Sequence, residues 1–248
     1  EELAQIEHHF VADRSINEPV TAGEFEHFAI AKLEELFATH DVVVAVGGSG
    51  MYIDALLHGL DPLPSDPEIK AQLEDRLEAE GISPLFLELK DADPVHAAKV
   101  DSRNPRRVIR ALEVIECTGK TYTEQLNSAP KQRNFKIVNW VLNMDRTQLY
   151  DRINRRVELM VSVGLEQEAR SLKEHQELVS LQTVGYREWW PYFRGEQDLE
   201  RTTELIQQNS RRYAKRQLTY FKRFKDAEWL DPNDVNSQEE SLRKAEIV

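Results

Sequence analysis

The stretch that most constrains the fold is "VVVAVGGSGMYIDALL", residues 42–57. Its five apolar residues at 42–46 predict a buried β-strand, the glycines predict a tight turn, and the apolar positions from Met51 predict a helix. A glycine-rich turn between a strand and a helix suits a phosphate, because free amides and the helix dipole converge there. The turn carries no lysine, however, and matches neither G-x-x-x-x-G-K-[ST] nor G-x-G-x-x-G. Ser49 is therefore either a ligand for an anionic group or a plain N-cap.

Helical patterns dominate the rest of the chain. A helix at 23–40 precedes the strand, a proline-rich break occupies 59–68, and a second β-rich run covers 135–144. The order helix–strand–helix indicates a slice of a parallel α/β sheet. Two strands are too few for a complete doubly wound sheet, so we expect part of the sheet to be missing. Further helices are predicted at 67–80, 83–91, 94–99, 104–118, 121–127, 147–163, 165–175, 185–193 and 198–224.

The charge distribution matters more than the net charge of −12. The acidic total argues against a nucleic-acid partner, but residues 103–110 hold four arginines and no acid, and residues 211–225 hold seven cations and no acid. The second run also carries aromatic residues, which suits stacking on unpaired bases. Each run is either a solvated helix face or the binding surface of an anionic partner, and RNA phosphate is a natural candidate.

Other features exclude several classes of protein. No apolar run approaches the ~20 residues of a membrane span, and the polar first residues are not a signal peptide. A single Cys117 excludes a disulfide framework and fits the cytoplasm. "TGKT" at 118–121 is not a P-loop, because the glycine required at position 114 is Val114 and a helix precedes it; Gly119 instead predicts a helix C-terminus. No spacing of potential ligands predicts a metal site.

Six blocks resemble, in order and over essentially the whole chain, the tRNA dimethylallyltransferase family. They are "HHF" with "EPVTAGEF", "VGGSGMYIDALLHGL", "NPRRVIRALEVIECTGK", "RINRRVELMVSVGLEQE", "LQTVGYREW" and "RRYAKRQLTYF". The resemblance implies an α/β fold with a P-loop-NTPase-like parallel sheet core whose N-terminal strands are missing here, a helical insertion domain and a helix-rich C-terminal part. The implied boundaries are 1–65 for the core part, 66–130 for the insertion that grips the anticodon, and 131–248 for the return to the core.

The implied reaction transfers a dimethylallyl group from dimethylallyl diphosphate to N6 of adenosine 37, in tRNAs that read codons beginning with U. The implied partners are the tRNA anticodon stem-loop and dimethylallyl diphosphate, with Mg²⁺ as cofactor and the protein as a monomer. Two alternatives stay open: an RNA-binding protein without catalysis, and an adenylate isopentenyltransferase that acts on free nucleotides. A small P-loop kinase explains the strand–turn–helix but none of the basic blocks.

The resemblance also assigns residues. Ser49 stands at the family's threonine position and is expected to be catalytic and to contact both diphosphate and tRNA, while Gly48 and Arg156 bind the diphosphate. Tyr220 replaces the usual tryptophan. The expected tRNA contacts, besides Ser49, are Lys70, Arg106, Arg107, Val108, Ile109, Arg110, Gln182, Thr183, Val184, Gly185, Tyr186, Arg187, Lys215, Arg216, Gln217, Leu218, Thr219, Tyr220, Phe221 and Lys222.

One departure from the family bears on activity. Its members begin with a P-loop and an Asp-Ser pair that supplies the general base, and neither pattern precedes the first matched block in this sequence. By comparison with the family, we expect a segment that precedes Glu1 to carry both. We therefore expect residues 1–248 alone to be inactive or nearly so.

Overall fold

The computed structural model describes residues 5–126 and 131–246, which form two compact units. The first unit comprises residues 1–54 and 135–248, and the second comprises residues 55–134. The predicted insertion at 66–130 falls inside the second unit, although its last four residues, and the last residue of the helix predicted at 121–127, lie outside the described residues. Each unit is considered by itself below.

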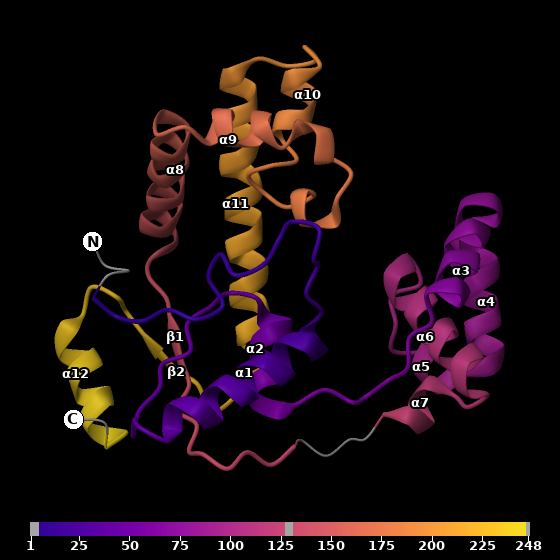
Figure 1. The fold of residues 1–248 in the computed structure, drawn as a ribbon, viewed down its shortest axis with the longest axis horizontal. Coiled ribbons are helices and arrows are strands. Elements are labelled where there is room, and N and C mark those ends of the chain that lie inside the picture. Colours follow the sequence, from indigo (N-terminus) through magenta and orange to yellow (C-terminus); the bar gives the residue numbers. More distant parts are fainter. Residues whose placement is uncertain (1–4, 127–130, 247–248) are drawn as a thin grey trace. The chain divides into compact units, whose positions relative to one another are not determined.

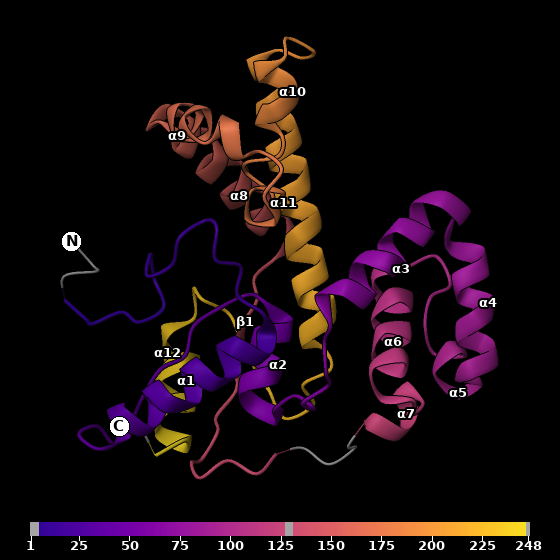
Figure 2. The same ribbon diagram turned by 45° about the vertical axis from the view of Figure 1, so that its right-hand side comes forward.

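The second unit is a helical bundle (Figure 2). Three of its helices begin where the sequence supplies caps: the side chains of Asp66, Asp93 and Asn104 each accept a backbone N–H of the first turn, and proline follows each of them at the first helical position. Leu73, Leu85, Leu89, Val108 and Leu112 fill the core. The helices are α3 Pro67–Glu80, α4 Ile82–Ala92, α5 Pro94–Ala97, α6 Pro105–Thr118 and α7 Tyr122–Gln125.

The first unit combines helices with a small parallel sheet. Strand β1, Trp140–Leu142, pairs in parallel with β2, Glu228–Leu230. In Figure 1 the long helix α11, Leu199–Phe221, runs beside α8, Arg146–Ser162, and a core around Trp189 and Ile206 joins these helices to α9 and α10. The other elements are α1 Ala22–Phe37, α2 Gly50–His58 (which continues into the second unit), α9 Leu165–Ser171, η2 Lys173–His175, η3 Val179–Leu181, α10 Trp189–Phe193 and α12 Val235–Lys244.

The predicted strand at 42–46 does not form. Residues 42–49 have no regular secondary structure, and the side chains of Val44 and Val46 are 75% and 93% exposed. A strand needs a neighbour to pair its backbone N–H and C=O groups, and within the described residues the only ladder is the one between β1 and β2. The second β-rich run, 135–144, shortens to β1 because its partner β2 is only three residues long.

Most predicted helices are confirmed within a few residues, and one difference has a local cause. The helix predicted at 185–193 begins only at Trp189, because Gly185 adopts φ +102° in a preceding turn. The predicted helix end at Gly119 is confirmed: this residue is the left-handed C-cap of α6. The sequence reading missed β2 and α12. No helix among the described residues is long and apolar enough to cross a bilayer.

Candidate functional site

The glycine turn of residues 47–50 leads directly into α2. The carbonyl oxygen of Ser49 accepts hydrogen bonds from the amides of Tyr52 and Ile53, at 2.9 and 3.1 Å, so Ser49 occupies the N-cap position of α2 through its backbone. Its side chain is exposed, and its hydroxyl has no hydrogen-bond partner among the described residues. The two readings of Ser49 are therefore compatible: the backbone starts the helix and the hydroxyl is available to a ligand.

Helix α11 packs closely against this turn. The side-chain amide of Gln217 donates to the carbonyl oxygen of Gly48 at 2.8 Å. A Cβ atom at Gly48 would overlap the side-chain nitrogen of Gln217, and a Cβ at Gly50 would overlap the ring of Tyr220. Gly50 is thus required by the close approach of the Tyr220 ring, a Cβ at Gly48 would displace the Gln217 amide, and α11 is the element that approaches.

Tyr220 makes the second attachment. Its hydroxyl donates to Oδ2 of Asp54 in α2 at 2.8 Å, and the guanidinium of Arg223 lies 4.8 Å from the centre of its ring and 3.7 Å from the same carboxylate. Burial and the neighbouring Asp54 carboxylate raise the pKa of Tyr220 to about 12. The phenol is therefore a permanent donor near neutral pH.

The cations of α11 lie away from this contact. The side chains of Lys215, Arg216 and Lys222 are exposed, and none has an ion-pair partner within the described residues. Thr219 is exposed beside them, whereas Leu218 and Phe221 are half-buried. Of the eight residues predicted to contact tRNA in this helix and at its end, four present side chains to solvent and two hold the glycine turn.

Arg156 lies on α8 and is exposed, without a hydrogen bond or ion pair among the residues that the structure describes. Helix α8 is attached to α11 through Asn154, whose side-chain oxygen accepts from Arg211 and whose carbonyl oxygen accepts from Gln207. The guanidinium of Arg156 is therefore available to an anion, on a helix that is fastened to α11.

The predicted contact segment 182–187 is a turn organised by Glu188, which sequence reasoning missed. This carboxylate belongs to a residue only 5% exposed and accepts from the Gly185 amide at 2.9 Å, from Arg187 Nε at 3.1 Å and from Asn209 Nδ2 of α11 at 2.8 Å. Three donors around one buried carboxylate make it a structural anchor. Its sequence signal is weak, since a glutamate beside an arginine is common on any surface.

Within this turn the side chains of Gln182, Thr183 and Arg187 are exposed and that of Val184 is half-buried. Tyr186 is held by a hydrogen bond from its hydroxyl to Oε1 of Glu168, at 2.6 Å. Burial, followed by the bond to Glu168, raises the pKa of Tyr186 to about 12.

In the second unit the predicted contacts divide sharply. Arg106 and Arg107 lie exposed in the first turn of α6, with no ion pair among the described residues. Val108 and Ile109, in contrast, are 0% and 6% exposed and belong to the core. For these two side chains the prediction is corrected: the amphipathic face of α6 turns them inward, where they offer no surface to RNA.

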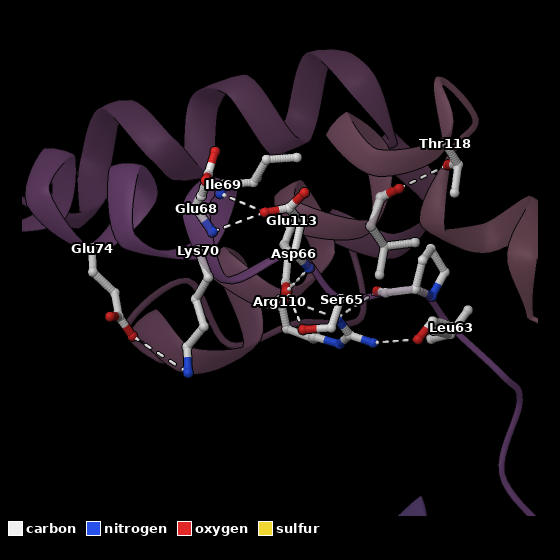
Figure 3. Close-up of polar contacts among 12 residues, drawn as sticks. Leu63, Ser65, Asp66, Glu68, Ile69, Lys70, Glu74, Arg110, Glu113 and Thr118 are labelled. Atoms are coloured by element: carbon white, nitrogen blue, oxygen red, sulfur yellow. Dashed lines mark hydrogen bonds and ion pairs between the residues drawn. The ribbon is translucent and has the colours of Figure 1, made fainter.

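Arg110 is engaged on three acceptors (Figure 3). Its Nη1 donates to the carbonyl oxygen of Pro64 and to Oε2 of Glu113, both at 2.8 Å, and its Nη2 donates to the carbonyl oxygen of Leu63 at 3.0 Å. Arg110 therefore fastens the segment that leads into α3 onto α6.

Glu113 completes this attachment from a side chain only 3% exposed. Its Oε1 accepts from the Ser65 hydroxyl at 2.5 Å and from the Asp66 amide at 3.1 Å. Burial acts to raise the pKa of Glu113, but the hydrogen bonds from Ser65 and Arg110 outweigh it and leave the pKa below its ordinary value. Lys70, one turn into α3, is half exposed and lies 3.8 Å from Glu74 (Figure 3).

The residues described do not form a magnesium site of their own. They contain no group of three His, Cys, Asp or Glu side chains that could hold a metal ion, and the carboxylate of Asp54 beside the turn is engaged by Tyr220 and Arg223.

A model of the IPP transferase family matches residues 1–224. The chain belongs to the IPP transferase family. It is thus a prenyltransferase, with an α/β fold of a small parallel sheet and many helices. A tRNA dimethylallyltransferase of Christiangramia forsetii is 46% identical over 239 residues, which cover 96% of this chain and 79% of the relative. A tRNA dimethylallyltransferase 1 of Bacteroides fragilis is 44% identical, over 94% of this chain and 77% of the relative.

Solved structures of IPP transferases agree with this fold. The tRNA isopentenylpyrophosphate transferase of Bacillus halodurans aligns with a TM-score of 0.66 at 32% identity, over 99% of this chain and 78% of that protein. A eukaryotic dimethylallyltransferase that acts on tRNA aligns with a TM-score of 0.78 at 24% identity, over 98% of this chain and 64% of that protein. At that identity the second likeness concerns the fold alone.

Proposed function

We propose that this IPP transferase carries a dimethylallyl group from dimethylallyl diphosphate to N6 of adenosine 37, in tRNAs that read codons beginning with U. The observation that carries the proposal is the contact between the glycine turn and the basic helix. Gln217 of α11 is bonded to Gly48, so a turn suited to a phosphate and a row of exposed cations suited to RNA lie on the same packed pair of elements.

The reaction makes one bond and breaks two, the C–O bond to the diphosphate and one N6–H bond. The N6 nitrogen attacks the allylic carbon, a C–N bond forms, the C–O bond to the diphosphate breaks, and N6 loses a proton. The Ser49 hydroxyl is proposed to donate a hydrogen bond to the leaving diphosphate. It lies at the N-terminus of α2, where free amides also favour an anion. Arg156 is proposed as the cation that contacts the diphosphate. The N6 proton passes to a base that is not among these residues.

The exposed cations are proposed to hold the RNA. Arg106 and Arg107 of the second unit, Lys215 and Arg216 of α11, and Lys222 directly after α11 are proposed to contact phosphates of the anticodon stem-loop. Adenosine 37 must leave its stack to reach the donor, as in other enzymes that modify a base. The proposal also includes a P-loop-NTPase-like core around the glycine turn, Mg²⁺ accompanying the diphosphate, and a monomeric protein.

The test uses protein expressed from the whole gene, unmodified tRNA with A36-A37-A38, Mg²⁺ and dimethylallyl diphosphate. The RNA is digested to nucleosides and prenylated adenosine is sought by mass, with AMP as competitor. The expected product forms on tRNA and resists AMP. Suppression by AMP would favour an adenylate transferase. Retained tRNA binding without any product would favour an RNA-binding protein without catalysis.

A further inference from the structure

Gln217 and Tyr220 form the face of α11 that meets the turn, and Lys215 lies on the opposite face. Gln217 and Tyr220 are three residues apart and therefore share a face, and both reach the segment that contains Ser49. Lys215 and Arg216 of α11 are exposed, and so is Lys222, which directly follows the helix. One helix thus presents neutral donors to the turn and charged groups to solvent.

We propose that Gln217 and Tyr220 are positioning residues, which clamp the turn 47–50 and the start of α2 onto α11 and so set the place of the Ser49 hydroxyl relative to RNA bound on the same helix. Gln217 holds the turn at the Gly48 carbonyl, two residues before Gly50. Tyr220 holds α2 at Asp54, one turn after its start. The two attachments lie on either side of Ser49, so its hydroxyl is fixed from both directions.

Close packing supports this role independently of the hydrogen bonds. Gly48 and Gly50 each lack a side chain at the point where Gln217 and Tyr220 respectively approach, and a methyl group at either position would displace the partner. A residue that reached outward to a nucleotide would not require a glycine opposite it. The glycines of the turn therefore serve α11 as well as an anionic ligand.

The inference rests on the proposed function, so its test includes one measurement that needs no activity. In the free protein, without tRNA, Gln217→Met and Tyr220→Phe are expected to speed hydrogen exchange at the amides of residues 47–53, because each loses one attachment of that segment. Lys215→Ala is the matched comparison on the same helix, and it should leave this exchange unchanged. Unchanged exchange in both Gln217→Met and Tyr220→Phe would overturn the clamp.

The kinetic test separates positioning from RNA contact. A displacement near 1 Å at a reacting group costs on the order of 100-fold, so we expect Gln217→Met and Tyr220→Phe to lower kcat about 10- to 100-fold with tRNA Kd unchanged. Lys215→Ala is expected to weaken tRNA Kd instead. Weaker tRNA binding by Gln217→Met and Tyr220→Phe, with kcat unchanged, would make these residues direct RNA contacts and refute the inference.

Gly50 provides a second, coupled test. Gly50→Ala should lower kcat in the native protein, because the added methyl group meets the Tyr220 ring. In a Tyr220→Ala background the same change should cost much less, and equal costs in both backgrounds would contradict the clamp. If the native protein yields no prenylated tRNA but exchange at 47–53 still responds to Gln217→Met, the proposed function fails and the clamp remains.

Discussion

Arg110 is predicted to support the fold of the second unit and not to neutralise RNA phosphate. Its guanidinium donates to the carbonyls of Leu63 and Pro64 and to the buried Glu113 carboxylate. Arg110→Ala removes these donors together and leaves Glu113 with Ser65 and the Asp66 amide alone. A hydrogen bond to a charged group contributes about 1.5–3 kcal/mol net. Because the Arg110 side chain is 34% exposed, water replaces part of the loss, and we expect the free energy of unfolding to fall by about 2 kcal/mol.

Two measurements check this role. Urea unfolding followed by circular dichroism gives the stability change, and the dependence of tRNA affinity on salt concentration gives the number of phosphate contacts. Each lost contact flattens the slope of log K against log salt by about 0.7 to 0.9. Arg106→Ala and Arg107→Ala, on the same turn of α6, should flatten this slope with little effect on stability. Arg110→Ala should lower stability and leave the slope unchanged. A flattened slope with unchanged stability in Arg110→Ala would refute the reasoning.

Three further predictions concern stability and ionisation. Leu112→Ala should lower the free energy of unfolding by about 2–5 kcal/mol, since this side chain is 1% exposed in the core; a loss below 1 kcal/mol, measured by urea unfolding, would contradict that packing. Glu113 has a lowered pKa, so its stabilisation is present above its unfolded-state pKa and lost as the pH falls through the folded-state value. Acid unfolding of the native protein should therefore be steeper below pH ~4.5 than that of Glu113→Gln, and identical profiles would argue against it. Tyr186→Phe should remove a phenol absorbance step near pH 12 in an alkaline titration, whereas loss of a step near pH 10 would contradict the bond to Glu168.

The sequence predicted helices well where caps and apolar spacing agree. The helix at 67–80 matches α3 residue for residue, because Asp66 caps it and Pro67 begins it. The sequence predicted the strand at 42–46 wrongly. Five apolar residues in a row form a buried strand only when another segment pairs with them. A strand is a property of two segments, and the pattern of one segment contains no information about its neighbour.

The sequence indicated which cations and which hydroxyl are exposed near the turn, while their roles in binding stay predictions. The cations of α11 could be recognised from a run without acids, and Ser49 from the glycine turn. The inward direction of Gln217 and Tyr220 could not, because a neutral residue between cations looks the same whether it meets RNA or backbone. Glu113 and Glu188 were overlooked for a related reason: burial makes a carboxylate into an anchor, and burial depends on contacts distant in sequence.

The measurement that tests the central claim most directly compares two unmodified tRNAs that differ only at position 37, one with adenosine and the other with guanosine. Each is incubated with protein from the whole gene, Mg²⁺ and dimethylallyl diphosphate labelled in its dimethylallyl group, and the label on the RNA is counted. The account predicts label on the tRNA with adenosine 37 and none on the tRNA with guanosine 37. Equal label on both, or none on either while both still bind, would contradict it.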